Sequence, residues 1–333
     1  MLKKVSRSFA LTIPELPESL GRAVTTAYLV CRIIDTIEDD ERLPVDKKAY
    51  FFEEFVKVVN AESPAALFAQ SLHPLLSDSV TDAEKELILN TPAVISGVLS
   101  LGPGRQKAIR RCAAVMAGGM LQFQGMKSPA GLRDMADFDR YCYFVAGVVG
   151  EMLTELFCDY SPEIARHRKE LLTLAVSFGQ GLQMTNIIKD LWDDRARGTC
   201  WIPRSVFEAA GCDPGDLAGY SGTEPFGRGI GEMIAVARGH LKDALTYTTL
   251  IPPAEAGIRR FCLWAIGMAV FTLRNINKRK DYKSGRDVKI TRRTLKSIIL
   301  VSNLTLRSDF LLERMFELAT RDLPEKKSIH ASC

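Results

Sequence analysis

A line of polar side chains on one predicted helix constrains this chain more than any other feature. In residues 183–194, QMTNIIKDLWDD, the residues Gln183, Asn186, Asp190 and Asp194 recur at intervals of three, four and four. This spacing puts them on one face of an α-helix, about one turn apart. Asp190 and Asp194 repel each other there, by roughly a few tenths of a kcal/mol on an open helix and by more in a closed cavity. The pattern therefore predicts a cation between them.

A second copy of this arrangement lies upstream, in residues 28–40, YLVCRIIDTIEDD. Asp35 and Asp39 are again four residues apart, and Arg32 and Tyr28 continue the same face. Two helices that face each other with such pairs would form an all-oxygen site for Mg²⁺, which keeps some waters and is usually shared with substrate phosphates. The alternative is that each run is only a solvated acidic face. That reading is disfavoured because both runs are embedded in apolar residues.

The remaining sequence predicts an all-α chain with no convincing strand or repeat. Proline, glycine and capping signals delimit the helices, and Thr81 with Glu84 matches a capping box. A short helix is expected after Ser63 as its cap, and a long one starts at Pro162 and contains the second aspartate motif. The other expected helices are 19–40, 46–59, 81–101, 105–125, 137–158, 227–250, 254–276, 291–303 and 308–321. We expect a single domain over residues 1–333.

Small residues interrupt two of these helices. Gly118 and Gly119 lie in the helix expected over 105–125. Ala146, Gly147 and Gly150 lie in the helix expected over 137–158. Because glycine costs about 1 kcal/mol relative to alanine inside a helix, such groups indicate either close helix packing or room for a substrate. The sequence leaves both readings open.

Charge and cysteine content say little about partners. Lys and Arg exceed Asp and Glu by four, and residues 278–293 alone carry eight basic and two acidic residues, a net charge of +6. This segment is expected to be a loop or flap. It could bind nucleic acid through phosphates, but no recognition motif or set of stacking aromatics accompanies it, so no nucleic-acid partner is expected. The eight cysteines occur singly, which favours a reduced, cytoplasmic chain.

No targeting or membrane-spanning segment is predicted. The N-terminal apolar run is broken by Pro14, and the longest apolar run, 261–273, has 13 residues where a membrane helix needs about 20. We expect a soluble protein, a monomer or weak homo-oligomer, that touches membranes peripherally to release an apolar product.

Several segments together resemble the squalene and phytoene synthase family, closest to its squalene-forming members. They are SRSFA at 6–10, YLVCRIIDTIEDD at 28–40, RYCYFVAGVVG at 140–150, QMTNIIKDLWDD at 183–194, and FCLWAIGMAVFTLRN at 261–275 followed by YKSGRDVKI. The resemblance implies the isoprenoid synthase fold, a helical bundle around a central cavity. It also implies that Mg²⁺ and two farnesyl diphosphates bind there and condense head to head through presqualene diphosphate.

The resemblance further implies roles for individual residues. The implied metal ligands are Asp35, Glu38, Asp39, Asp190 and Asp194. The implied substrate-binding residues are Ser6, Arg7, Phe9, Tyr28, Arg32, Val145, Ala146, Gly150, Gln183 and Asn186. Asn186, Lys189, Lys283 and Lys289 would hold NADPH, the hydride donor that completes squalene.

Tyr141 matches the tyrosine to which the family's deprotonation step is assigned. Its ordinary pKa of about 10 makes it a weak base at neutral pH unless nearby cations lower that pKa or it relays the proton to the released diphosphate. The alternative is a core tyrosine with a satisfied hydroxyl group. A catalytically inactive scaffold of the same fold is a further alternative, disfavoured by the intact aspartate pairs.

One position departs from the family pattern. Squalene-forming members carry an arginine about four residues before the proline of the loop after the second motif, whereas here Thr199 precedes Pro203. Arg195 or Arg197 could substitute for it. NADPH use is therefore a weaker expectation than prenyl coupling, and dehydrosqualene, presqualene diphosphate or a phytoene-type product stay as alternatives.

Overall fold

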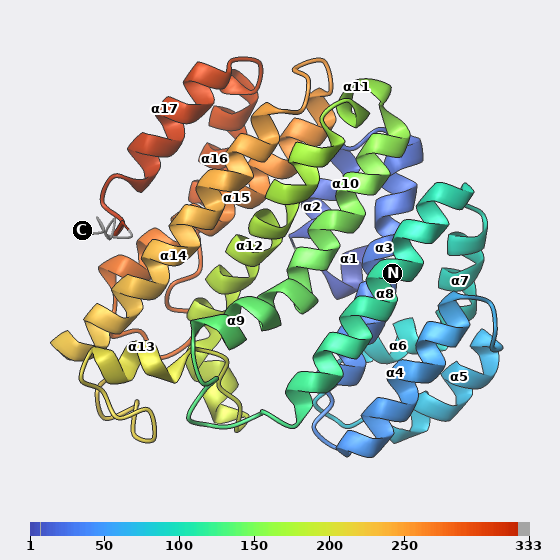
Figure 1. Cartoon of the computed structure of the whole chain (residues 1–333), viewed down its shortest axis with the longest axis horizontal. Helices are drawn as coiled ribbons and strands as arrows, with labels where there is room; N and C mark the ends of the chain where they lie inside the picture. The colour runs from blue at the N-terminus through green and yellow to red at the C-terminus, as the bar shows by residue number, and fades with distance from the viewer. Residues whose placement is uncertain (7, 326–333) are drawn as a thin grey trace, which may run out of the picture. The chain divides into compact units, whose positions relative to one another are not determined.

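A computed structural model describes residues 1–6 and 8–325, and helices account for nearly all the regular structure in those ranges (Figure 1). The only pairing of extended backbone among the described residues is an isolated bridge between Leu132 and Pro203. The all-α prediction is confirmed. The chain divides into two compact units: unit 1 comprises 1–126 and 148–172, and unit 2 comprises 127–147 and 173 onward. The expectation of one domain over the whole chain stays a prediction.

Unit 1 is organised around α3, which packs against α4, α6, α7, α8 and α10. Leu20, Ile33, Ile34 and Ile37 recur on its inner face and are fully buried, as an amphipathic helix requires. The elements of unit 1 are α1 (Leu2–Val5), α2 (Phe9–Thr12), η1 (Ile13–Glu15), α3 (Glu18–Asp39), α4 (Val45–Val59), α5 (Ala65–Leu72), η2 (His73–Leu75), α6 (Asp82–Leu89), α7 (Thr91–Leu99), α8 (Pro103–Gln124), α10 (Val148–Tyr160) and α11 (Pro162–Ala165).

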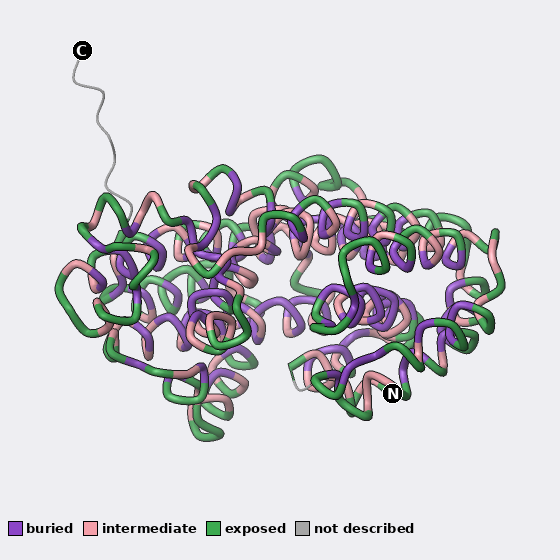
Figure 2. Tube along the Cα trace, turned by 90° about the horizontal axis from the view of Figure 1, so that it is seen from below, coloured by how far each residue is buried: buried purple, intermediate pink, exposed green. Residues whose placement is uncertain are grey.

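Unit 2 is built from long helices, of which α15 packs against α14, α16 and α17. Its elements are α9 (Met135–Cys142), η3 (Tyr143–Gly147), α12 (Arg168–Ala196, which begins in unit 1), α13 (Arg204–Ala209), α14 (Glu224–Thr249), α15 (Ala256–Lys278), α16 (Arg292–Thr305) and α17 (Asp309–Thr320). Along both units, buried and exposed turns alternate on the helices (Figure 2).

Three predicted helix features are wrong in detail. The helix expected over 81–101 is two helices, α6 and α7, because Pro92 stands in the first turn of α7 and cannot continue the hydrogen bonding of α6. Ser63 does not cap α5; its hydroxyl group donates to Glu54 instead. The helix expected to start at Pro162 is α11, and α12 begins separately at Arg168. The capping box of Thr81 and Glu84 is present as predicted.

Two helical stretches are long and apolar enough to cross a membrane by length and composition, 135–160 and 256–278. Buried core helices pass the same test. In the most apolar window of the second stretch, α15, 61% of the residues are buried inside the protein, and 44% are buried in that of the first.

Candidate active site

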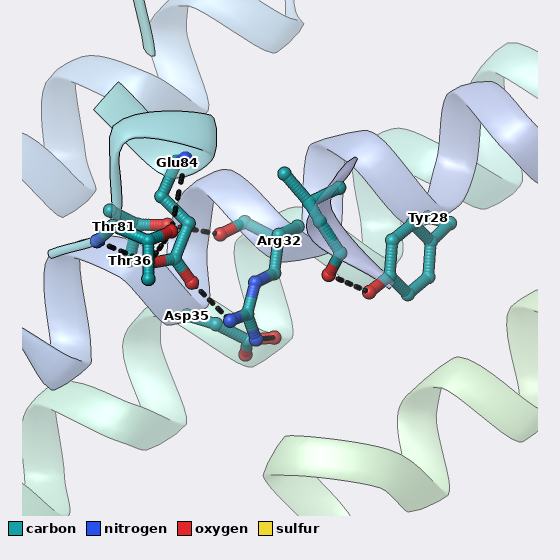
Figure 3. Close-up of polar contacts among 7 residues, drawn as sticks. Tyr28, Arg32, Asp35, Thr36, Thr81 and Glu84 are labelled. Carbon is teal, nitrogen blue, oxygen red and sulfur yellow. Dashed lines mark hydrogen bonds and ion pairs between the residues drawn. The ribbon is translucent and has the colours of Figure 1, made fainter. Parts of the chain in front are cut away.

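The first aspartate motif is held in unit 1 by a side chain from a neighbouring helix. Arg32 on α3 donates to Glu84 on α6 and lies 3.8 Å from Asp35 (Figure 3). Glu84 in turn accepts hydrogen bonds from the backbone and hydroxyl group of Thr81, at 2.9 and 2.8 Å. The capping box of α6 therefore holds the Glu84 carboxylate in place, and this carboxylate in turn holds Arg32. The sequence predicts this capping box but not its connection to the motif.

The electrostatics of this motif favour an added cation. Burial, helped by the charges of Asp39 and Glu84, outweighs the Arg32 guanidinium and raises the pKa of Asp35 to about 7. The Arg32 Nε atom is buried and has no hydrogen-bond partner among the described residues. A hard cation would relieve the repulsion between the carboxylates, and an anionic oxygen would satisfy Arg32 Nε. A Mg²⁺ ion with a bound phosphate group would supply both the cation and the anionic oxygen.

Glu38 is placed differently from Asp35 and Asp39. It is buried, and its Oε1 atom accepts a hydrogen bond of 3.4 Å from Gln124. The Lys48 ammonium group donates to the Glu38 backbone carbonyl at 2.5 Å. Its assignment as a metal ligand stays a prediction, which this placement does not favour.

The N-terminal residues assigned to substrate lie beside Tyr28. The Tyr28 hydroxyl group donates to the Val5 carbonyl at 3.1 Å, and its ring lies 5.1 Å from that of Phe9. The Ser6 hydroxyl group accepts from the Phe9 backbone at 3.0 Å. The structure thus brings Ser6, Phe9 and Tyr28 together. Arg7 lies outside the described residues.

The second motif, on α12 in unit 2, has the polar face that its spacing predicts. Met184, Ile187, Ile188 and Leu191 are buried, whereas Asn186 is exposed and Gln183, Asp190 and Asp194 are partly exposed.

Two cations accompany this face. Lys189 lies 3.1 Å from Asp190 and donates to Asn186 at 3.2 Å, and Arg197 contacts Asp194 at 2.5 Å. Burial raises the pKa of Asp190 despite Lys189, and the charge of Asp193 adds to that rise.

The loop between α15 and α16 covers this motif. The Gly285 backbone donates to Asp193 Oδ2 at 2.8 Å, and the buried Tyr282 hydroxyl group donates to the Ile188 carbonyl. A Cβ atom at position 285 would lie 2.4 Å from Asp190 Oδ1, so a larger residue here would require this carboxylate to shift. The segment expected to be a loop or flap is a loop, and it lies on α12; that it acts as a flap stays a prediction. Asp193 and Tyr282 were missed, although both lie in segments that the sequence analysis singled out.

The flap lysines assigned to the nucleotide lie at the surface. The Lys283 ammonium group donates to Ser221 at 2.9 Å, and Lys289 is exposed. Because Gly285 docks on α12, the loop that carries Lys283 lies against the helix that carries Lys189. Three lysines on two adjoining segments fit a ligand with several phosphate groups.

Tyr141 lies in a buried aromatic pair in unit 2. It is 4% exposed and its ring stacks on Trp201, with centroids 3.9 Å apart and planes 9° apart. The Lys127 ammonium group lies over the Trp201 ring, 5.7 Å from its centroid. A tyrosine so enclosed is shielded from water, and its stacking partner Trp201 contacts a cation. Trp201 is a neighbour that the sequence alone could not supply.

Val145 and Ala146, assigned to the prenyl wall, fall in the π-helical turn η3. Such turns are often found at functional sites. Gly179 on α12 lies so close that a Cβ atom there would overlap the Ala146 carbonyl, and a Cβ on Gly147 would come within 3.0 Å of Tyr143. Gly147 therefore serves close packing. Gly118, in contrast, has nothing within 4 Å of its Cβ position.

The two arginines near Thr199 have different surroundings. Arg195, near the end of α12, donates to the Pro129 carbonyl at 2.5 Å and to the Pro214 carbonyl at 3.4 Å, and so ties two loops to this helix. Arg197 pairs with Asp194 and brings its charge to the second motif. Of the two, Arg197 is better placed to substitute for the family arginine.

No group of three or more His, Cys, Asp or Glu side chains is gathered for a metal within the described ranges. Mg²⁺ does not require such a group, because it is commonly bound by one or two carboxylates together with waters and substrate phosphates. Each aspartate pair, taken by itself, therefore remains a suitable set of Mg²⁺ donors.

Known proteins resemble this chain over most of its length. A family model described as squalene/phytoene synthase matches residues 2–294. The squalene synthase of Schizosaccharomyces pombe is 30% identical over 98% of this chain and 69% of its own length, and that of Solanum lycopersicum is 33% identical over 82% of this chain and 62% of its own length.

Solved structures agree with these matches. A complex of TcSQS with the ligand E5700 has a TM-score of 0.73 at 27% identity, covering 95% of this chain and 87% of that one. A dehydrosqualene synthase shares the fold, with a TM-score of 0.65 at 19% identity over 92% of this chain and 94% of that one.

Proposed function

Because this chain belongs to the squalene/phytoene synthase family, we propose that it converts two farnesyl diphosphates to squalene through presqualene diphosphate, using Mg²⁺ and NADPH. Head-to-head prenyl condensation is the reaction of this family, and the chain is a prenyltransferase of that class. The observation that carries the proposal is the electrostatics of the first motif: Asp35, whose charge is disfavoured by burial and by Asp39, lies beside an arginine whose buried Nε atom has no hydrogen-bond partner among the described residues.

The first chemical demand is to stabilise the leaving diphosphate. Mg²⁺, when bound, would be held by Asp35, Asp39, Asp190 and Asp194 and would neutralise the charge that develops on this anion. Arg32 would take a phosphate oxygen through its Nε atom while Glu84 keeps the guanidinium in place. Lys189 would act similarly beside Asp190. These residues bind and orient the diphosphate. Their positive charges stabilise it most when it carries the most negative charge.

The second demand is to protect a carbocation and to remove one proton. The apolar wall around η3 would exclude water. Tyr141, enclosed against Trp201, would pass the proton from the prenyl chain to the released diphosphate. Its hydroxyl oxygen accepts this proton as its own O–H proton leaves, so it need not be ionised beforehand.

The third demand is hydride delivery, which NADPH supplies when bound. Lys189, Lys283 and Lys289 would meet its phosphates, and Asn186 would provide a neutral hydrogen-bonding group. An NADPH-independent product, either dehydrosqualene or presqualene diphosphate, is the second candidate. Thr199 favours it, since the family arginine is absent there, Arg195 is already engaged by the Pro129 carbonyl, and Arg197 is paired with Asp194.

Product analysis with and without NADPH tests the proposal. Purified protein given farnesyl diphosphate and Mg²⁺ should accumulate presqualene diphosphate alone and form squalene once NADPH is added, as followed by mass spectrometry. Identical products under both conditions would reject the squalene assignment and leave prenyl coupling intact. No prenyl product under either condition would reject both.

The lysines of the flap provide a second test. The double variant K283Q/K289Q should raise the KM for NADPH about tenfold while presqualene diphosphate forms at the normal rate, because the lost charges meet cofactor phosphates. K47Q/K107Q, which removes two exposed lysines of unit 1, is the matched control. An equal effect of both double variants would show that net charge alone matters.

A further inference from the structure

The outer faces of α16 and α17 carry an unusual number of exposed apolar side chains. Leu304 is 75% exposed, Phe310 68% and Leu300 60%. Six of the fourteen large apolar residues that are exposed in the described ranges lie on these two helices: Leu300, Leu304, Phe310, Leu311, Met315 and Leu318. Contiguous exposed apolar surface on a folded protein usually marks an interaction site.

These residues form stripes at helical spacing. Leu300 and Leu304 are one turn apart on α16, and Leu311, Met315 and Leu318 follow one face of α17. The opposite faces of the same helices already face the core of unit 2, since Ile298, Leu312 and Phe316 are buried. The exposed stripes are therefore additional to the faces that folding needs.

The corner between the two helices is held firmly from inside. Arg259 on α15 is completely buried and donates to the Leu306 and Ile251 carbonyls, both at 2.7 Å. It also pairs with Asp309, the first residue of α17, at 2.8 Å. Leu304 and Phe310 thus project from a fixed corner on either side of this anchored turn.

The charges beside the stripes are mostly positive. Arg292, Arg293, Lys296 and Arg307 are exposed and form no ion pair among the described residues. The acids of α17 are largely compensated: Asp309 pairs with Arg259, and Glu317 with Arg314, while Glu313 is the exception. Two copies of this chain that met through this face would bring these cations together, which opposes self-association.

We infer that the α16–α17 corner is a docking surface for an anionic lipid membrane. Leu304 and Phe310 enter the boundary between headgroups and acyl chains, while Arg292, Arg293, Lys296 and Arg307 meet lipid phosphates. Apolar burial combined with several basic residues is what binding at a membrane surface requires. The inference does not depend on the proposed reaction.

Vesicle flotation of the full chain tests this surface. The protein should float with vesicles of phosphatidylcholine and phosphatidylglycerol at least tenfold more strongly than with phosphatidylcholine alone, and binding to the anionic vesicles should weaken with salt. The variant L304S/F310S should lose at least tenfold in binding to anionic vesicles. R293E/K296E should lose a similar factor on anionic vesicles, since each surface charge contributes about fivefold.

Matched variants in unit 1 control for general changes of hydrophobicity and charge. L67S/L89S removes two leucines that are 58% and 50% exposed, and K47E/K107E reverses two exposed lysines. Both should bind within twofold of wild type, and circular dichroism should show all variants folded. Wild-type binding that is equal on both lipids, or unchanged in L304S/F310S, would overturn the proposal. So would a dimer in sedimentation velocity that L304S/F310S abolishes, with no vesicle binding.

Discussion

The two aspartate motifs share a spacing but differ in what surrounds them. In unit 1, Asp35 lies beside Arg32, which a side chain from another helix holds, so the environment is built by packed helices. In unit 2, the only ion-pair partner of Asp190 among the described residues is its sequence neighbour Lys189, and a loop lies on the helix through Gly285. The first motif is thus supported by a neighbouring helix, whereas the second is covered by the loop between α15 and α16. A loop-covered motif is suited to admit and release ligands; a helix-supported one is suited to hold them.

The largest expected effect is a loss of turnover that is equal for substitutions in the two motifs. Asp35→Asn and Asp190→Asn should each lower turnover by about 10³-fold, because each removes a ligand charge that stabilises the leaving diphosphate. Steady-state assays with saturating farnesyl diphosphate measure this. Asp78→Asn, at a fully exposed side chain, should leave turnover unchanged. Normal turnover in Asp190→Asn would show that the metal assignment of the second motif is wrong.

A change confined to the loop should separate the motifs. Gly285→Ala would push the Asp190 carboxylate aside, and a misplacement of about 1 Å can cost as much as 10²-fold in rate. We expect kcat/KM to fall about ten- to a hundredfold with little change in Tm. Gly239→Ala on α14, where nothing lies within 4 Å of the added carbon, is the matched control and should not affect the rate. If Gly285→Ala behaved like this control, the loop would be unimportant to the motif.

The sequence predicts the local features of both motifs but not their long-range contacts. The helix ends of α3 and α4 were predicted within about one residue, because proline and apolar periodicity are local signals. The polar face of α12 followed from spacing alone. The contacts of Arg32 with Glu84 and of Asp193 with Gly285 join residues 52 and 92 positions apart, and no local pattern encodes which partner is chosen. The π-turn at η3 was missed for a related reason: its sequence is as apolar as an ordinary helix, and its form depends on packing against Gly179.

The support of the first motif can be tested by removing the charge of Glu84. Glu84→Gln retains a residue that completes a capping box, so the loss should be mainly that of the Arg32 contact, about 1–2 kcal/mol of unfolding free energy in urea. Burial acts to raise the pKa of Glu84, but Arg32 and Thr81 outweigh it and lower that pKa. The stabilisation is therefore present above the unfolded-state pKa of about 4.3 and is lost as the pH falls through the lower folded-state pKa.

The control for this variant is Glu86→Gln. Glu86 pairs with Lys4 at 2.7 Å, but both side chains are largely exposed and screened by solvent, so the loss should be much smaller than in Glu84→Gln. Equal losses in the two variants would indicate that the Arg32 contact is no stronger than a surface ion pair.

The smallest expected effect is the loss of stability that ionised Asp35 causes when no metal is bound. The pKa of Asp35 is about 7 in the folded chain, against an ordinary value of 3.8, so the folded state keeps a proton that the unfolded state releases between these values. Stability should therefore fall as the pH rises from about 4 to 7, and Asp35→Asn should escape this loss. In chelator, the variant should melt about 3 °C above wild type at pH 8 and within about 1 °C of it near pH 4. Adding Mg²⁺ at pH 8 should raise the Tm of wild type more than that of the variant. A Tm gap that is the same at both pH values would mean that Asp35 is ionised throughout, and that the first motif tolerates its charges without a cation.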